Sequence, residues 1–347
     1  MNTKIWTVDD SENLSTSYSH ISQAAKLLTE NEVVAFPTET VYGLGANAYS
    51  DEAVQKIFAA KGRPADNPLI VHIASKTSLD DIVTNIPDYV YKLIDEFWPG
   101  PLTFILPKKG ERLSTLVTAG LNTVGVRMPD HQIALALIKE ANVPIAAPSA
   151  NRSGKPSPTL ASHVYHDLNG KIGGIVDGGP TGVGVESTVL DCTTNIPAIL
   201  RPGGITKEQL EEIVGKVSVD KALIEEGHAP KSPGMKYTHY SPNAPVIIAN
   251  GNYSFIQKLV NEYRQAGKSV GVLTTREGIP YLQADKVIAC GRRNDLRTVA
   301  TELYDTLRTF DETDIDIIIS ESFPKSGVGE AIMNRLLKAA GNRVVEE

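Results

Sequence analysis

The sequence predicts an α/β protein in which a domain with a twisted mixed sheet precedes a linker and a small Rossmann-like three-layer α/β domain. Its 347 residues exceed what one hydrophobic core usually serves, so two domains are expected. Short apolar runs typical of strands alternate with amphipathic helical patterns along the chain. From Ala244 onward this alternation becomes regular. We therefore expect a first domain over residues 1–213, a linker over 214–243 and a second domain over 244–347.

Helical and strand-like patterns are interleaved in the first domain. Ile21, Ala24 and Leu28, for example, recur at helical spacing on one face. The patterns predict helices over residues 18–29, 51–60, 88–97 and 132–140, and strands over residues 33–36, 69–73, 102–106, 122–128, 143–147, 188–191 and 198–200. This interleaving favours a twisted mixed sheet over a simple parallel one.

A glycine-dense stretch covers residues 173–187 near the end of the first domain. Because glycine has no side chain, such a stretch lets the backbone approach a ligand closely. Its spacing matches neither the P-loop pattern nor G-x-G-x-x-G. The stretch is therefore not a Walker or Rossmann nucleotide site.

The second domain alternates strands and helices. The patterns predict strands over residues 246–249, 269–273, 286–290 and 315–320, and helices over residues 254–265, 296–309 and 329–340. This is the order of a small Rossmann-like unit, although the dinucleotide fingerprint is missing. The linker before it is rich in proline and carries Tyr237, His239 and Tyr240, side chains that a plain spacer does not need.

Composition and charge narrow the class of protein. Hydrophobic residues make up 41% and charged residues 22%, as in ordinary soluble globular proteins. No apolar run reaches the roughly 20 residues of a membrane helix, and the N-terminus lacks a signal-peptide pattern. Cys192 and Cys290 lie in apolar runs, where buried thiols in a reducing cytoplasm are expected. The net charge of −7 argues against a large nucleic-acid-binding face.

Two cations, Lys61 and Arg63, stand two positions apart in a loop bounded by glycine and proline. Taken alone, such a pair is more often a solvated surface pair. The two cations can also hold an anion with several charges, such as a nucleotide polyphosphate. A second small-residue loop, residues 147–151, follows another apolar run. The polar residues that accompany the pair are Thr38, Thr40, Asn67 and His72.

Several other residues have two readings. Arg127 ends a predicted buried strand and needs an anionic partner there, either a structural carboxylate or a substrate carboxylate. His72 follows an apolar strand, where a core histidine is more common than a functional one. Trp98 is interpreted as a core anchor at a sharp turn rather than as a ligand contact. Glu39 and Asp66 are candidate general bases or surface and turn-capping groups, and the base is left unassigned.

Long motifs occur in a fixed order along the chain: PTETVYGLG, KGRPADNPLIVH, WPGPLT, VGVRMP, PSAN, SPGMKYTHYSP and GEAIMNR. Together they resemble the two-domain members of the YrdC-type family, the threonylcarbamoyl-AMP synthases of tRNA modification. The K-x-R and S-x-N pairs of that family stand here as Lys61, Arg63, Ser149 and Asn151. The resemblance covers nearly the whole chain and implies that the mixed-sheet domain is YrdC-like.

The resemblance implies a nucleotidyltransferase that makes L-threonylcarbamoyl-AMP from L-threonine, bicarbonate or carbon dioxide, and ATP, with release of pyrophosphate. This is the first step of N6-threonylcarbamoyladenosine formation at the tRNA adenosine next to the anticodon. The product would pass to a separate transfer enzyme, so stable tRNA binding is not expected. Magnesium is expected to enter with ATP, and no organic cofactor is implied. No protein nucleophile is required, in keeping with the lack of a Ser-His-Asp or Cys-His signature.

The family's site positions can be placed on this sequence. Lys61 and Arg63 would neutralise phosphate charge as the catalytic pair. The threonine positions fall on Thr40, His72, Arg127, Ala147 and Ser187, with Arg127 facing the substrate carboxylate and Ala147 acting through its backbone. The ATP positions fall on Lys61, Arg63, Asn67, Thr123, Ser149, Asn151, Ser157, Arg201 and Tyr237.

The sequence allows alternatives both for the linker and for the function of the chain. The linker is interpreted as a lid over the active site, with a tether packed on the domain interface as the alternative. A double-stranded-RNA-binding or translation-associated module is possible for this fold, but residues 1–210 carry more acidic than basic side chains. A carbamoyl-transfer role in hydrogenase maturation would need zinc-binding cysteine clusters, which two cysteines cannot provide.

Overall fold

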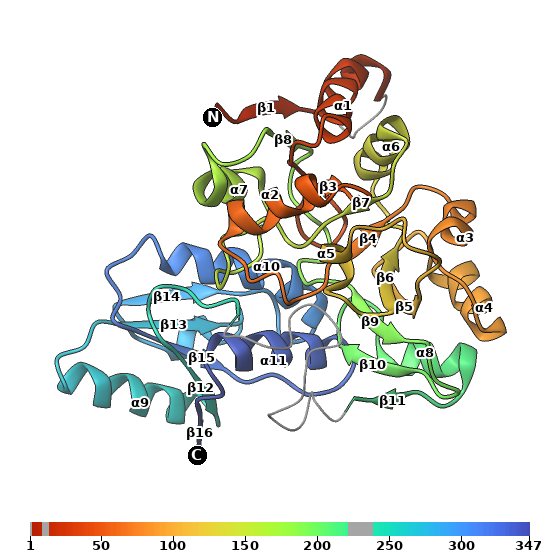
Figure 1. Ribbon diagram of the computed structural model, residues 1–347. Coiled ribbons are helices and arrows are strands. Elements are labelled where there is room, and N and C mark those ends of the chain that lie inside the picture. The colour runs from red at the N-terminus through yellow and green to blue at the C-terminus, as the bar shows by residue number, and fades with distance from the viewer. Residues whose placement is uncertain (1, 9–13, 221–238) are drawn as a thin grey trace. The chain divides into compact units, whose positions relative to one another are not determined.

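The computed structural model describes residues 2–8, 14–220 and 239–347 (Figure 1). Contacts divide the chain into two compact units. The first comprises Met1–Ser153, Pro158–Gly182 and Glu186–Lys236, and the second comprises Gly154–Ser157, Val183–Val185 and Tyr237–Glu347. No helix in the described ranges is long and apolar enough to cross a membrane. Most of the predicted linker, residues 221–238, lies outside the described residues.

The strands of the first unit form one mixed sheet, which confirms the predicted fold class. Among the described residues its order is β1-β8-β2-β3-β7-β4-β6-β5-β9-β10-β11. The strands are β1 (Lys4–Thr7), β2 (Val34–Phe36), β3 (Gly43–Asn47), β4 (Ile70–His72), β5 (Leu102–Pro107), β6 (Thr123–Arg127), β7 (Ile145–Ala146), β8 (Gly174–Asp177), β9 (Thr188–Asp191), β10 (Ala198–Arg201) and β11 (Ser218–Val219). The sequence patterns missed β1, β3, β8 and β11, which are short or rich in glycine.

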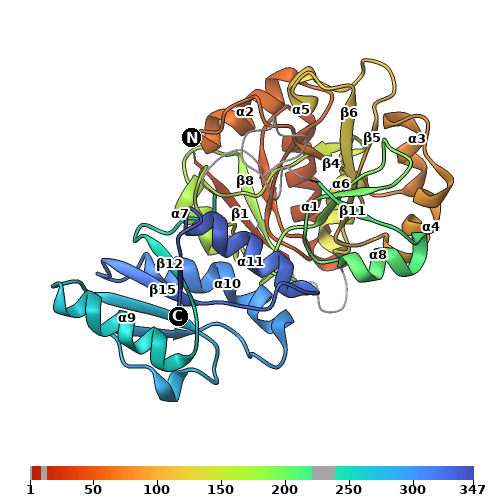
Figure 2. The ribbon, with the colours of Figure 1, turned by 90° about the horizontal axis from the view of Figure 1, so that it is seen from below.

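Helices pack their apolar sides against this sheet. They are α1 (Leu14–Thr29), α2 (Asp51–Lys61), α3 (Leu79–Ile82), α4 (Asp88–Phe97), α5 (Thr115–Thr118), α6 (Gln132–Ala141), α7 (Ala161–Leu168) and α8 (Lys207–Val214). α1 and α6 lie side by side in both ribbon views (Figures 1 and 2). Ile21 and Leu28 of α1 share a buried cluster with Leu137 of α6. A larger apolar cluster includes buried residues of α2, α4, α7 and α8.

The ends of α2 position the cationic pair. Ser50 caps the first turn by accepting a hydrogen bond from the Ala53 amide at 3.2 Å. At the other end Gly62 has φ +61°, a left-handed conformation that glycine adopts without strain. The Arg63 amide then donates back to the Phe58 carbonyl at 3.0 Å. The glycine between the two cations is therefore the helix cap, and it turns Arg63 away from the helix axis.

The second unit is a three-layer α/β structure with a parallel sheet. Its strands are β12 (Val246–Asn250), β13 (Val270–Thr274), β14 (Lys286–Ala289), β15 (Ile317–Glu321) and β16 (Val344–Glu346), in the order β14-β13-β15-β12-β16. Its helices are α9 (Tyr253–Gln265), α10 (Leu296–Phe310) and α11 (Val328–Ala339). α9 covers one face of the sheet, and α10 and α11 cover the other (Figure 2). Strand β16 was not expected from the sequence.

Candidate active site

Two neighbouring parallel strands bring together two of the predicted threonine-site residues. β4 ends at His72 and β6 ends at Arg127, and these residues are partners in the β4–β6 register. β7 pairs antiparallel with the other edge of β4, and the Ala147 amide beyond it donates to the Ile70 carbonyl at 2.9 Å. His72 and Arg127, which are far apart in the sequence, thus meet at the carboxyl ends of two neighbouring strands, where open α/β sheets bind ligands.

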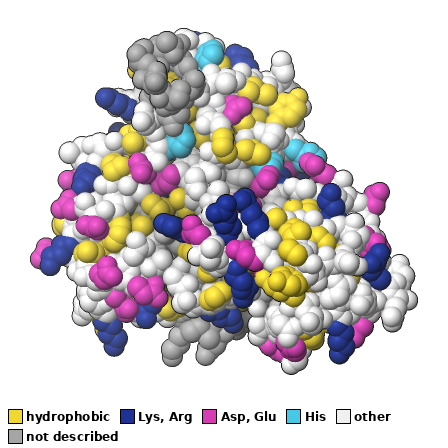
Figure 3. All heavy atoms as spheres, turned by 180° about the vertical axis from the view of Figure 1, so that it is seen from behind, with side chains coloured by type: hydrophobic (Ala, Val, Ile, Leu, Met, Phe, Trp, Pro, Cys, Tyr) yellow, Lys and Arg dark blue, Asp and Glu magenta, His cyan; other side chains and the backbone are white. Residues whose placement is uncertain are grey.

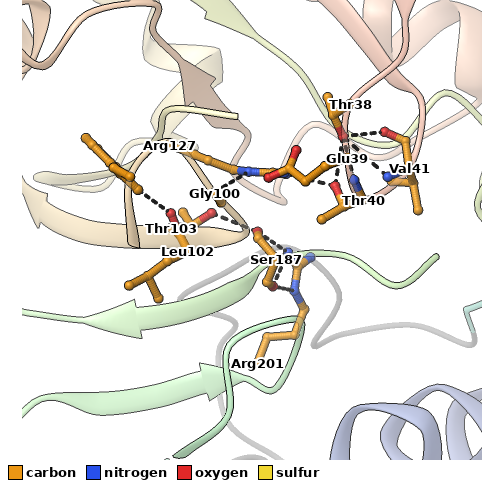
Figure 4. A network of polar contacts seen from close by, with 11 residues as sticks. Thr38, Glu39, Thr40, Val41, Gly100, Leu102, Thr103, Arg127, Ser187 and Arg201 are labelled. Atoms are coloured by element: carbon orange, nitrogen blue, oxygen red, sulfur yellow. Dashed lines mark hydrogen bonds and ion pairs between the residues drawn. The ribbon is translucent and has the colours of Figure 1, made fainter. Parts of the chain in front are cut away.

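Arg127 is held by three contacts from two loops (Figure 4). Its Nη1 donates to Thr40 Oγ1 at 3.0 Å, and its Nε donates to the Gly100 carbonyl at 3.3 Å. Its Nη2 lies 2.5 Å from Glu39 Oε2 in an ion pair. The Arg127 side chain is only 5% exposed, so its charge needs such a partner. The structure places Glu39 there, a residue interpreted from the sequence only as a general base or as a surface or turn-capping group.

The turn that carries Glu39 and Thr40 is fixed by Thr38. Thr38 Oγ1 donates to the Val41 carbonyl at 2.7 Å and accepts from the amides of Thr40 and Val41 at 3.2 and 3.3 Å. The glycine-dense stretch supports the same turn, because the Gly182 amide donates to the Glu39 carbonyl at 3.1 Å. This close backbone approach gives the glycine-dense stretch a structural role beside the turn.

His72 is buried and electrically neutral. Burial, reinforced by the positive charge of Arg127, lowers the pKa of His72 to about 3. Its Nδ1 lies 3.2 Å from the Ile70 carbonyl, and its ring meets Phe36 edge-on at 6.1 Å. The structure places His72 in the core and beside Arg127 at once, so the two readings of this residue are compatible.

Ser187 and Arg201 form a second group of polar contacts next to the group around Arg127. Arg201 donates to the Ser187 carbonyl from Nε and Nη2 at 3.1 and 2.9 Å, and to Ser187 Oγ at 3.0 Å. Ser187 Oγ also lies 2.8 Å from Thr103 Oγ1 on β5. The turn before β5 carries Gly100, which contacts Arg127. The chain segment from Gly100 to Thr103 therefore connects the two groups (Figure 4).

The K-x-R and S-x-N pairs meet in space. Lys61 Nζ donates to the carbonyls of Ser149 and Asn151, both at 2.5 Å. Ser149 Oγ donates to Asn151 Oδ1 at 2.5 Å. Lys61 is buried, so the solvated-pair reading is wrong for it. The lysine therefore orders the PSAN loop. Arg63 Nη2 donates to the carbonyls of Asn67 and Pro68, both at 3.4 Å.

The remaining predicted residues differ in how they are placed. Asn67 is buried, and its Oδ1 has no hydrogen-bond donor among the described residues. Thr123 opens β6 opposite Pro107. Ser157 is buried and groups with the second compact unit, whereas Tyr237 lies outside the described residues. Asp66 is exposed.

Trp98 is a core anchor, as predicted. Its Nε1 donates to the Leu102 carbonyl at 2.7 Å, and its ring packs on Phe104 with centroids 5.1 Å apart. The following Gly100 donates its amide to the Met128 carbonyl at 2.8 Å. A Cβ on Gly100 would lie 2.3 Å from the Phe97 carbonyl oxygen, so only glycine fits this turn beside Arg127.

Both signs of charge occur on the face of the molecule drawn in Figure 3. On the face drawn in Figure 3, basic side chains stand among acidic ones, and no broad surface of basic side chains alone is visible there. Within the described ranges, no group of three or more His, Cys, Asp or Glu side chains is arranged to hold a metal ion.

Comparisons with known proteins agree along the whole chain. A model of the Sua5, YciO and YrdC family, described as Telomere recombination, matches residues 26–203, and one described as Threonylcarbamoyl-AMP synthase, C-terminal domain, matches residues 205–341. The chain is 62% identical over 345 residues to the threonylcarbamoyl-AMP synthase of Bacillus subtilis, which covers 99% of this chain and 100% of the relative. The corresponding protein of Pyrococcus abyssi is 48% identical over 93% of this chain and 94% of its own length.

Solved structures agree with these relatives. P. abyssi Sua5 complexed with L-threonine superposes with a TM-score of 0.93 at 45% identity, covering 99% of this chain and 100% of that one. E. coli YciO superposes with a TM-score of 0.52 at 21% identity, covering 58% of this chain and 96% of that one, which shows the fold alone.

Proposed function

The chain belongs to the threonylcarbamoyl-AMP synthase family of nucleotidyltransferase enzymes, and on that premise we propose that it joins L-threonine, bicarbonate or carbon dioxide, and ATP into L-threonylcarbamoyl-AMP. Pyrophosphate is the second product. The observation that carries the proposal is the convergence of Thr40, His72 and Arg127 at the carboxyl ends of β4 and β6. A buried guanidinium at this place suits the carboxylate of an amino acid.

Threonine would bind at Arg127, with hydroxyl groups of Thr40 and Ser187 available to its polar atoms. Both hydroxyl groups are already part of the contact network that fixes Arg127 and Arg201. A neutral His72 adds no second positive charge beside Arg127. The relative that was solved with L-threonine supports this substrate.

ATP would lie against the two paired loops. Lys61 orders the Ser149–Asn151 loop, and Arg63 follows the capped end of α2. Arg201 adds a third positive charge near Ser187. Asn67 and Thr123 are the other described residues of the proposed nucleotide set in this unit. Magnesium would enter bound to the ATP phosphates, as part of the substrate.

The chemistry needs positioning more than it needs a covalent catalyst. The threonine amine adds to carbon dioxide and gives a carbamate. A carbamate oxygen then attacks the α-phosphorus of ATP, and pyrophosphate leaves. The chain's part is to hold two anions together and to offset the charge that builds on the phosphates.

The product would serve the first step of N6-threonylcarbamoyladenosine formation and pass to a separate enzyme that acts on tRNA. We place this reaction in the cytoplasm, where reduced thiols are the rule. Cys192 and Cys290 are free and buried, and burial raises the pKa of Cys290 to about 12. The formal net charge of −7 does not favour the RNA-binding alternative. Salt-dependent filter binding of double-stranded RNA would reveal that alternative directly.

Product analysis tests the proposal. The purified chain is incubated with ATP, L-threonine and ¹³C-bicarbonate, and the products are separated for mass spectrometry. We expect a nucleotide with the mass of threonylcarbamoyl-AMP that contains one ¹³C atom. A threonyl adenylate without the label, or AMP alone, would contradict the proposed function.

A further inference from the structure

Glu39 is a buried carboxylate with too few partners. Its side chain is 13% exposed, and both carboxylate oxygens are themselves shielded from solvent. The oxygen nearest to Arg127 lies 2.5 Å from Nη2, but off the direction of an aligned hydrogen bond. Within the described parts of the chain, neither oxygen has a hydrogen-bond donor. A buried carboxylate in this state has unused capacity for N–H donors.

The surrounding turn holds the backbone of Glu39 in this position. Thr38 fixes the backbone on both sides of it, and Gly182 holds the Glu39 carbonyl. Figure 4 shows the carboxylate lying along the Arg127 guanidinium. A buried ion pair stabilises a fold only when additional hydrogen bonds satisfy its remaining polar atoms. Arg127 Nη2 and both Glu39 oxygens lack them among the described residues, so a purely structural pair explains this arrangement poorly.

An adjacent cation and anion are the complement of an α-amino acid. The carboxylate and the ammonium group of such a molecule are attached to the same carbon, so they need a positive and a negative group side by side. We propose that Glu39 binds the α-ammonium group of L-threonine, while the α-carboxylate of threonine replaces Glu39 on the Arg127 guanidinium. This inference rests on the proposed function, because it takes threonine as the substrate.

The exchange gives every charged group a partner. The ammonium group carries three N–H donors, which supply what the Glu39 oxygens lack. The threonine carboxylate supplies an acceptor for Arg127 Nη2. Glu39 would then fix the position of the nitrogen that becomes the carbamate nitrogen. In the absence of threonine the Glu39–Arg127 pair keeps the two charges in place.

Paired ligands test this inference. Calorimetry on the full chain compares L-threonine with the 2,3-dihydroxybutanoate of the same configuration, in which a hydroxyl group replaces the amine. We expect Glu39→Gln to weaken threonine binding about tenfold or more, because a charged hydrogen-bond partner is lost. Binding of dihydroxybutanoate should not weaken, because its carboxylate also takes the place of Glu39 on Arg127 and it has no ammonium group that could lose a partner. Glu96→Gln, the same change at an exposed residue of α4, should leave both affinities unchanged.

The other outcomes are decisive as well. An equal loss for both ligands would mean that Glu39 only holds Arg127 in place, and an equal gain would mean that it only blocks the guanidinium. Either result overturns the inference without touching the proposed function, provided that the wild-type chain still makes the labelled product. Failure of the wild-type chain to bind threonine would overturn both. If Glu39→Gln does not fold, Glu39→Asp decides: it should weaken threonine more than dihydroxybutanoate, and an equal effect on both would contradict the inference.

Discussion

Arg127 is the residue on which the proposed threonine site depends. It is buried at the end of β6, and its contacts come from the PTET turn and the turn before β5. We expect Arg127→Met to lower threonine affinity about tenfold or more, because a charged hydrogen bond is lost while much of the side-chain bulk is kept. ATP affinity of the free enzyme should change little. Calorimetry with each ligand checks this, with exposed Arg297→Met as the control. A larger loss for ATP would assign Arg127 to the nucleotide site.

His72 links the site to stability at low pH. The pKa of His72 is about 3 in the folded chain and about 6.5 when unfolded, so below pH 6.5 the unfolded state binds a proton that the folded state does not. Stability from this group is complete above pH 6.5 and falls by about 1.4 kcal/mol per pH unit as the pH drops towards 3. Urea unfolding at several pH values measures the free energy of unfolding. His72→Gln should reduce its decrease below pH 6.5, whereas His166→Gln, at an exposed residue, should not. Equal slopes for both variants would contradict the neutral, buried histidine.

Sequence patterns identify some of these site residues and not others. Arg127 was recognisable because a charge that ends an apolar strand needs a partner. Glu39 was not recognisable as that partner. Its position depends on the Thr38-centred turn and on Gly182, which is distant in the sequence. The tertiary arrangement around β4 and β6 determines which carboxylate lies beside Arg127.

At the scale of elements, the capped end of α2 determines where the K-x-R pair lies. Gly62 has φ +61° with open space around its Cα. Gly62→Ala should lower the free energy of unfolding by about 1 kcal/mol, because a side chain is strained in this conformation. It should also weaken ATP binding, because Arg63 follows the cap. Gly110 has the same φ and the same open space, so Gly110→Ala is a matched control that costs stability and leaves ATP binding unchanged. If both variants bind ATP with equal affinity, the conformation of the α2 cap does not affect ATP binding.

The longer helices were predictable and several strands were not. α4 and α6 have strong apolar periodicity and begin where it begins, whereas the start of α2 is marked by its Ser50 cap and its acidic first turn. β3 has the sequence GLGAN and β8 has GIVD, so glycine hides their strand pattern, and they are held by neighbouring strands. β7 is only two residues long, shorter than the apolar run that predicted it, because the chain leaves the sheet to form the PSAN loop.

At the scale of the whole molecule, the linker remains a prediction from the sequence. Its aromatic residue Tyr237 lies outside the described residues. If the linker closes over bound substrates, Tyr237→Ala should weaken ATP binding and slow synthesis, since a lid excludes water from a hydrolysable mixed anhydride. Limited proteolysis should show the linker protected when ATP and threonine are both present. Unchanged kinetics with cleavage indifferent to ligands would mean that the linker is only a tether.

In the proposed reaction carbamate formation precedes adenylation, and pyrophosphate release tests this order most directly. The full chain is supplied with ATP and with threonine and bicarbonate together, each alone, or neither, in buffers freed of carbon dioxide where bicarbonate is omitted. We predict rapid pyrophosphate release only with both, because the carbamate must exist before its oxygen can attack the α-phosphorus. Release at the same rate with threonine or bicarbonate omitted would contradict this reaction and indicate ATP hydrolysis or simple aminoacyl adenylation.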